Sequence, residues 1–198
     1  MHAPLPVLCL ASASPRRRAL LAQIGVAHVV RSADLDETPH ELESPRDYVA
    51  RVAAAKARAI WSADPALPVL GADTIVVVDG AIFGKPRARV QGLAMLAGLS
   101  GREHEVLSAV ALADARGVAI AVSASTVRLR ALTPEECSAY WDSGEPHDKA
   151  GAYAIQGLAA AFIESLHGSY SGVMGLPLFE TAALLRAAGL PYGRGLPV

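Results

Sequence analysis

The residues best suited to a chemical role lie at positions 12–18, where the chain reads Ser-Ala-Ser-Pro-Arg-Arg-Arg. Ser14 favours a helix N-cap, and Pro15 suits the first helical position. The three arginines then fall beside the positive end of the helix dipole, where each exposed cation costs about 0.3–1 kcal/mol. A bound phosphate would reverse that cost, because free backbone N–H groups and guanidinium groups both favour it. A solvated basic turn, partly neutralised by nearby acids, is the alternative.

Asp73 is the most suggestive single acid, because it lies inside the strongly apolar segment 69–78. A carboxylate in a buried strand costs several kcal/mol unless it is paired or coordinated. Strand alternation puts Asp73 on the same face as Gly71, which leaves room for a ligand or for another backbone. The pattern favours a functional carboxylate, while an ordinary buried ion pair or an edge-strand carboxylate stays open.

Two lysines extend this set of charged groups. The helix predicted over 45–63 has an apolar stripe on which Lys56 is the lone ammonium, with Arg51 and Arg58 on the opposite, solvent-facing side. Lys56 either reaches a phosphate or an acidic partner in a cleft, or extends to solvent at a rim. Lys85 precedes a proline that biases it toward an extended backbone, so its side chain can project from a stiff loop. Loop lysines usually face water, which is the plain alternative.

An acidic loop at 34–43 and a glycine-containing segment at 148–157 complete the candidate chemistry. Carboxylate oxygens suit Mg²⁺ or Mn²⁺, which usually keep several waters and bridge phosphates. Most acidic clusters are merely solvated, so we expect a single acid of this loop to contribute. Gln156 offers an amide donor and acceptor that can match the edge of uracil or thymine, although uncommitted glutamines usually lie at the surface.

The bulk composition excludes several classes of protein. The 198 residues carry a formal net charge of −1 and are 52% hydrophobic, which gives no sign of a nucleic-acid or membrane partner. No apolar stretch approaches the roughly 20 residues of a membrane helix, and residues 1–6 lack the features of a signal peptide. Two cysteines are too few for a disulfide framework. The histidines show no zinc-type spacing, and the sequence predicts a cytoplasmic protein.

Periodicity and turn signals predict a mixed-sheet α/β protein that forms a single domain over 1–198. Early helices and strands alternate, and hairpins dominate the middle. The predicted strands are 7–10, 28–32, 68–78, 81–83, 105–113, 118–132 and 159–166, and the predicted helices are 15–25, 45–63, 90–99, 134–143 and 177–188.

Taken together, these residues resemble the Maf family of nucleoside triphosphate pyrophosphatases, also described as septum-formation inhibitors. The resemblance covers nearly the whole chain in order and implies a two-lobed α/β fold, with an elongated mixed sheet flanked by helices and a central cleft. Its motifs are Leu-Ala-Ser-Ala-Ser-Pro-Arg-Arg at 10–17, Asp36-Glu37, Lys56, Gly-Ala-Asp-Thr at 71–74, Gly-Lys-Pro at 84–86, Asp-Lys-Ala-Gly-Ala-Tyr at 148–153, Ile-Gln-Gly at 155–157 and Gly-Leu-Pro-Leu at 175–178.

The resemblance implies hydrolysis of a nucleoside triphosphate to its monophosphate and pyrophosphate with a divalent cation, Mg²⁺ or Mn²⁺. Asp73 matches the family's proton acceptor, which would orient or deprotonate the attacking water. The positions tied to substrate choice are Arg16, Thr74 and Gln156. The positions expected to hold phosphate are Ser14, Arg17, Lys56 and Lys85. The expected metal-side carboxylates are Glu37 and Asp73.

Within the family, segment 148–157 is similar to the branch acting on dTTP and UTP, whereas the branch handling 7-methyl-GTP differs there. Ser108 stands where threonine is usual and Leu129 where phenylalanine is usual, which leaves the shape of the side pocket open. Two alternatives remain: 7-methyl-GTP specificity, and a non-catalytic nucleotide-binding regulator of cell division. The resemblance also makes a homodimer plausible, with no nucleic-acid or membrane partner.

Overall fold

The computed structural model describes residues 5–193, so the first four and last five residues of the predicted 1–198 domain lie outside the described residues, as does most of segment 1–6. Within 5–193, seven strands form one mixed sheet in the order β2-β1-β3-β5-β6-β7, with β4 paired to β3. The strands are β1 (Leu8–Leu10), β2 (His28–Val30), β3 (Val69–Val78), β4 (Ala81–Phe83), β5 (Glu103–Asp114), β6 (Gly117–Leu129) and β7 (Ile163–His167).

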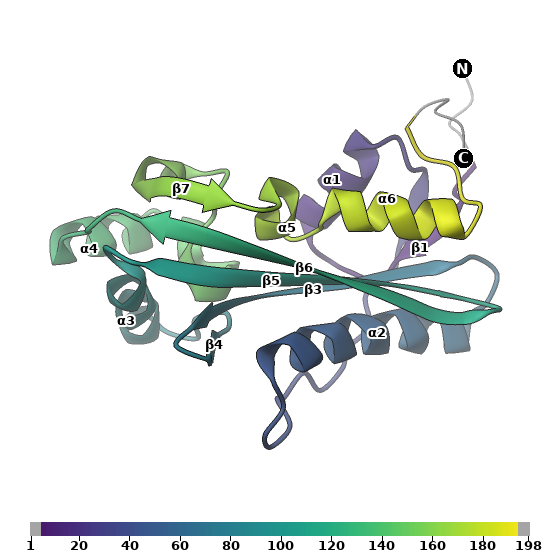
Figure 1. Cartoon of the computed structure of the whole chain (residues 1–198), viewed down its shortest axis with the longest axis horizontal. Coiled ribbons are helices and arrows are strands. Elements are labelled where there is room, and N and C mark those ends of the chain that lie inside the picture. Colours follow the sequence, from purple (N-terminus) through teal and green to yellow (C-terminus); the bar gives the residue numbers. More distant parts are fainter. Residues whose placement is uncertain (1–4, 194–198) are drawn as a thin grey trace.

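Helices cover both faces of this sheet (Figure 1). One apolar cluster joins α2 to β3 and β5, a second joins α1 and α6 to β1 on the other face, and a third joins α3 and α4 to the far end of the long strands. The predicted elongated mixed sheet flanked by helices is therefore confirmed. The helices are α1 (Pro15–Gln23), α2 (Pro45–Ala63), α3 (Arg89–Leu99), α4 (Pro134–Asp142), α5 (Tyr170–Met174) and α6 (Leu178–Ala187).

Strand β3 changes partners along one of its edges. β5 pairs with the other edge from Val69 to Val77, so β1 and β4 must share the remaining one. β1 pairs there only with Val69 and Leu70, in parallel, and β4 only with residues 76–78, in antiparallel. Residues 71–75 therefore have no strand partner on this edge within the described chain. The opening lies beyond the carboxyl end of β1, a location where α/β sheets commonly bind ligands.

Helix α2 packs closely on β3 at Gly71. A Cβ atom at this position would lie 2.3 Å from the Ala53 carbonyl oxygen and 2.7 Å from the Ala57 nitrogen. The sequence left open whether Gly71 makes room for a ligand or for another backbone. The structure shows that it makes room for the backbone of α2. The predicted inward stripe is also present: Lys56 is buried on it among apolar neighbours.

The predicted solvent-facing position is confirmed for Arg58, which is exposed, but only in part for Arg51, which is half-buried. The Arg51 side chain is only 27% exposed and forms a two-pronged ion pair with Glu43, at 2.6 and 2.8 Å. Its guanidinium also lies 5.4 Å from the centre of the Tyr48 ring. The acidic loop folds back on α2 and covers this arginine, which helical periodicity alone could not show.

The segment around 158–174 also differs from the prediction. The apolar run predicted as a strand from 159 begins instead as a short 3-10 helix (Leu158–Phe162), and β7 follows it. α5 was not predicted at all. Two further 3-10 helices, Glu145–Asp148 and Ala150–Ala152, lead into this region. None of the helices described between residues 5 and 193 has the length and apolar character needed to cross a bilayer.

Candidate active site

One cleft of about 940 Å³ is lined by every residue that the sequence placed in the site. These residues come from the start of α1, the acidic loop, α2, β3, the loop after β4, and segment 147–156. They are Ser14, Arg16, Arg17, Glu37, Lys56, Asp73, Thr74, Lys85 and Gln156. The cleft occupies the opening along β3, between the two ends of the sheet.

The first turn of α1 forms one wall of the cleft. Ser14 is the N-cap, as expected, and its Oγ accepts a hydrogen bond from the Arg17 N–H at 3.4 Å. The Arg17 side chain donates to the Gly175 carbonyl at 2.8 Å and to Ser12 Oγ at 3.2 Å. Burial lowers the pKa of Arg17 and the charge of Asp73 opposes that change; a guanidinium stays protonated in any case. The anchored arginine thus presents fixed positive charge.

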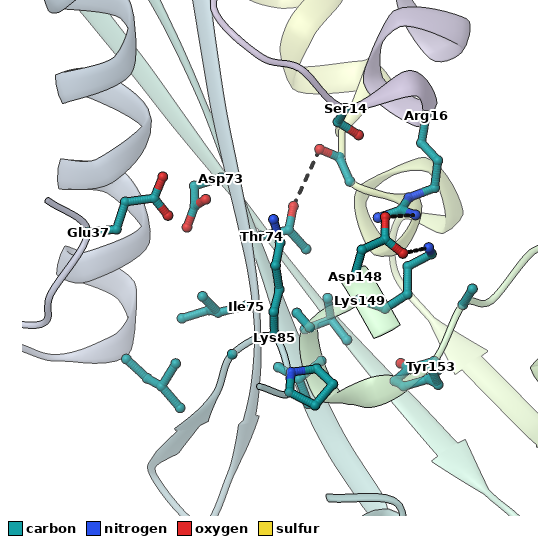
Figure 2. A pocket seen from close by; sticks show the side chains of 18 of the residues that line it. Ser14, Arg16, Glu37, Asp73, Thr74, Ile75, Lys85, Asp148, Lys149 and Tyr153 are labelled. Atoms are coloured by element: carbon teal, nitrogen blue, oxygen red, sulfur yellow. Dashed lines mark hydrogen bonds and ion pairs between the residues drawn. The ribbon is translucent and has the colours of Figure 1, made fainter. Parts of the chain in front are cut away.

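Lys56 joins two carboxylates on the opposite wall. Its Nζ lies 2.8 Å from Asp73 Oδ1 and 2.8 Å from Glu37 Oε1. The side chains of Lys56 and Asp73 are only about a tenth exposed, whereas Glu37 is 46% exposed. Figure 2 shows the two carboxylates facing each other beside α2. Asp73 is therefore in a buried ion pair, and Lys56 has an acidic partner. These two alternatives from the sequence are the same contact.

Tyr48 explains why Glu37, among the acids of its loop, reaches Lys56. The Tyr48 hydroxyl donates to the Glu37 carbonyl oxygen at 2.8 Å and so fixes the loop backbone over α2. Burial, with smaller contributions from the charges of Asp73 and Glu37, raises the pKa of Tyr48 to about 12, so the hydroxyl stays a donor at neutral pH. Glu43, another acid of the same loop, instead pairs with Arg51, and this contact lowers the pKa of Glu43 to about 2.

Thr74 lies on the opposite side of β3 from Asp73. Its Oγ1 shares a hydrogen bond of 2.8 Å with Ser108 Oγ, and Ser108 in turn donates to the Gly172 carbonyl at 2.6 Å. Ser108 is one of the two departures from the family pattern, and it therefore contacts Thr74, which lines the cleft. The other, Leu129, is fully buried in the cluster around α3 and α4 and does not line the cleft.

Segment 147–156 adds cleft residues that the sequence analysis did not assign. Asp148 lies 3.7 Å from Arg16 and is in contact with Lys149, and Figure 2 shows the three side chains gathered together. Tyr153 is buried, and its hydroxyl lies 2.8 Å from His104 Nε2. The Asp-Lys pair was visible in the motif, but sequence alone could not show that both side chains line the cleft.

The side chains present fit a divalent cation bound together with phosphate. Among the described residues, no three acidic, histidine or cysteine side chains come close enough to form a metal site from protein groups alone. Mg²⁺ usually binds through one or two carboxylates together with substrate phosphates and waters. The Asp73 and Glu37 carboxylates supply that number of protein ligands.

The fold and the site define a class of protein: an α/β protein with a cleft able to hold a polyanion between a basic helix N-terminus and a carboxylate pair. Sequence comparison identifies the family within this class. The sequence model of the family described as Maf-like protein matches residues 7–188, and the chain belongs to this family.

Curated relatives cover nearly the whole chain. A dTTP/UTP pyrophosphatase of Methylobacillus flagellatus is 54% identical over 183 residues, which is 91% of this chain and 92% of the relative. A dTTP/UTP pyrophosphatase of Bordetella parapertussis is 55% identical over 194 residues, covering 93% and 94% of the two chains. Among solved structures, a nucleoside-triphosphatase / dITP/XTP pyrophosphatase from Mycobacterium abscessus aligns over 93% of this chain and 98% of its own, with a TM-score of 0.44 and 18% identity.

Proposed function

We propose that this protein is a nucleoside triphosphate pyrophosphatase that hydrolyses dTTP and UTP to the monophosphate and pyrophosphate. The observation that carries the proposal is that the Asp73–Lys56–Glu37 centre and the basic start of α1 face one cleft of about 940 Å³. The activity named for relatives that are 54–55% identical supports it.

The basic groups would hold the triphosphate. Arg17 is anchored through its Nε on Gly175, and it lies in the first turn of α1, at the positive end of the helix dipole. Lys85 is exposed in the loop after β4 and lines the same cleft. Together these groups offset the negative charge that develops on the departing pyrophosphate.

Asp73 would act as the proton acceptor. Water adds to one of the two phosphorus atoms of the α–β anhydride, the bond between that phosphorus and the bridging oxygen breaks, and the water proton passes to the carboxylate. Lys56 keeps Asp73 oriented through the 2.8 Å contact on Oδ1. We infer that Mg²⁺ or Mn²⁺ would be held by Asp73 and Glu37, where it would supply positive charge against the phosphate oxygens.

Pyrimidine selection would fall to the remaining cleft residues. Gln156 presents an amide donor and acceptor suited to the edge of uracil or thymine, and Arg16 and Thr74 line the adjoining wall. The cytoplasmic location and the homodimer remain predictions.

The proposal is tested by measuring pyrophosphate release from a panel of nucleoside triphosphates, with and without Mg²⁺. We expect turnover of dTTP and UTP above that of 7-methyl-GTP. Asp73→Asn should lower kcat by at least about 100-fold, the typical contribution of a general base. Asp114→Asn is the matched control, because Asp114 ends β5 outside the cleft and pairs with Arg116.

Two outcomes would contradict the proposal. Turnover of UTP by Asp73→Asn at the parent rate would remove the proton-acceptor role from this residue. Tight nucleotide binding with no turnover by the unaltered protein would instead support the non-catalytic regulator.

A further inference from the structure

Two side chains outside the cleft hold the segment that carries Gln156. The Tyr140 hydroxyl accepts a hydrogen bond from the Ala154 N–H at 3.1 Å, on one side of Gln156. The Glu145 carboxylate accepts from the N–H groups of Leu158 at 2.8 Å and Ala159 at 3.3 Å, on the other side. Neither Tyr140 nor Glu145 lines the cleft.

The two anchors also contact each other. Tyr140 donates its hydroxyl proton to Glu145 Oε1 at 2.7 Å. The hydrogen bonds therefore form a closed clasp around residues 154–159, in which Ile155, Gln156 and Gly157 span the gap between the held ends. Such a short span between two fixed points has little freedom to change its backbone conformation.

Tyr140 is itself held firmly. It is buried in α4, and its ring lies edge-on to Phe162, with centroids 5.3 Å apart. α4 begins with a capping box, in which Thr133 and Glu136 bond to each other's backbone N–H groups. Burial raises the pKa of Tyr140, so the hydroxyl keeps the proton that it donates.

Glu145 approaches the segment because residue 157 is glycine. A Cβ atom at position 157 would lie 2.1 Å from Glu145 Oε2, far inside contact distance. Burial acts to raise the pKa of Glu145, but the hydrogen bonds from Leu158, Tyr140 and Ala159 outweigh it and leave the pKa lowered. The carboxylate is therefore ionised at neutral pH and can accept all three hydrogen bonds.

We propose that Tyr140 and Glu145 are positioning residues for nucleobase selection, which they control by fixing the backbone that presents Gln156. The inference rests on the proposed function and deepens it, because it assigns selectivity to groups that touch neither base nor phosphate. Fixing a recognition group before binding lowers the ordering cost that the ligand must otherwise meet. The clasp has no contact with Asp73, Lys56 or Arg17, so it governs selection rather than turnover.

The experiment compares kcat and KM for UTP and CTP in the full-length protein and in Glu145→Gln, Tyr140→Phe and Gln156→Ala. We expect Glu145→Gln and Tyr140→Phe each to raise KM for UTP several-fold and to lower the UTP-over-CTP ratio of kcat/KM at least about fivefold, with kcat for UTP within about threefold of the parent. Combining Glu145→Gln with Gln156→Ala should add little further loss of selectivity, because both changes act through one side chain.

Glu136→Gln is the matched control, since Glu136 is also a hydrogen-bonded carboxylate but lies in the first turn of α4 and pairs with Arg130, away from residues 154–159. It should leave the UTP-over-CTP ratio unchanged even where it lowers the melting temperature. Amide hydrogen exchange at Ala154, Leu158 and Ala159 should accelerate in Glu145→Gln and not in Glu136→Gln.

Failure of this inference is distinct from failure of the proposed function. If the unaltered protein turns over UTP and Gln156→Ala loses selectivity, while Glu145→Gln and Tyr140→Phe keep the parent ratio, the clasp has no positioning role. If Glu136→Gln lowers the ratio equally, the effect is one of general stability, and the inference is overturned. No turnover of UTP by the unaltered protein would overturn the proposed function, and the inference with it.

Discussion

At the scale of single residues, Lys56 contacts acidic partners, which is one of the alternatives that its position on the helix left open. The resemblance placed it among the phosphate-binding groups, whereas in the structure its ammonium lies between Asp73 and Glu37, 2.8 Å from each. Two carboxylates and one ammonium leave this centre with a net charge of −1, which favours a cation.

Replacing Lys56 by Met should therefore destabilise the protein and increase its response to metal. Loss of the ammonium leaves Asp73 buried without its counter-ion, at a cost of about 2–3 kcal/mol, below the full figure for a buried pair because Glu37 is half-exposed. Thermal unfolding with and without MnCl₂ measures the effect. Mn²⁺ should raise the melting temperature more in Lys56→Met than in the parent, because the ion can occupy the position between the carboxylates.

Lys85→Met supplies the control for this change. It removes the same charge from the same cleft, but Lys85 is exposed in the loop after β4. We expect little loss of stability and a smaller gain in Mn²⁺ response. Equal Mn²⁺ shifts in the two variants would show that general cleft charge, not the contact with the carboxylates, controls metal binding.

Two residues of the site could be singled out from the sequence because they broke a pattern. Asp73 interrupts an apolar strand and Lys56 interrupts an apolar helix stripe, so both were found without a structure. Their contact with Glu37 could not be predicted, because loop 34–43 holds several acids and its backbone is fixed by a hydrogen bond from Tyr48. Asp148 and Lys149 were left unassigned for a related reason: both line the cleft, but neither one breaks a pattern in the sequence.

At the scale of elements, the site depends on how closely α2 packs on β3. They approach closely at Gly71, two residues before Asp73 and facing the helix turn that ends just after Lys56. A wider separation here would pull the ammonium away from the carboxylate, because Lys56 belongs to the helix and Asp73 to the strand. The glycine thus sets the geometry of the ion pair although it carries no functional group.

Gly71→Ala should lower stability by about 1–3 kcal/mol, the usual cost of overpacking a core. The added methyl would lie 2.3 Å from the Ala53 carbonyl oxygen, which is backbone and cannot move aside alone. Urea denaturation followed by circular dichroism measures the change. Gly84→Ala is the control, since a Cβ there would meet no atom within 4 Å; an equal loss in both variants would show that the clash with Ala53 is not responsible.

Element boundaries could be predicted where local chemistry decides them. The cap of α1 forms at Ser14 as predicted, and Ser44 and Thr133 cap α2 and α4 in the same way, because each cap bonds within three residues of itself. Segment 158–174 could not be predicted in the same way. Its apolar run suits a helix or a strand equally, and its conformation depends on contacts with distant residues such as Glu145 and Ser125.

At the scale of the whole molecule, the cleft exists because two different strands, β1 and β4, pair with the two ends of one edge of β3. β1 leaves β3 after Leu70 to enter α1, and β4 joins it only at Val76. The basic turn, the carboxylate pair and segment 147–156 therefore meet along five residues of β3 edge. The sequence indicated each of these parts, but their convergence depends on pairing between strands far apart in the chain, which no local pattern specifies.

Stability of the whole fold should fall as the pH drops below neutrality, because of His104. Burial, and to a lesser extent the charge of Arg102, lowers the pKa of this histidine from 6.5 to about 4, and its Nδ1 has no hydrogen-bond partner among the described residues. Between these two values the unfolded chain binds a proton that the folded protein does not, so the free energy of unfolding should decrease by up to about 1.4 kcal/mol per pH unit. Urea denaturation between pH 7 and 5 measures this slope. His104→Gln retains a polar partner for the Tyr153 hydroxyl but cannot titrate, so its slope should be flatter; a slope as steep as the parent's would place the responsible group elsewhere.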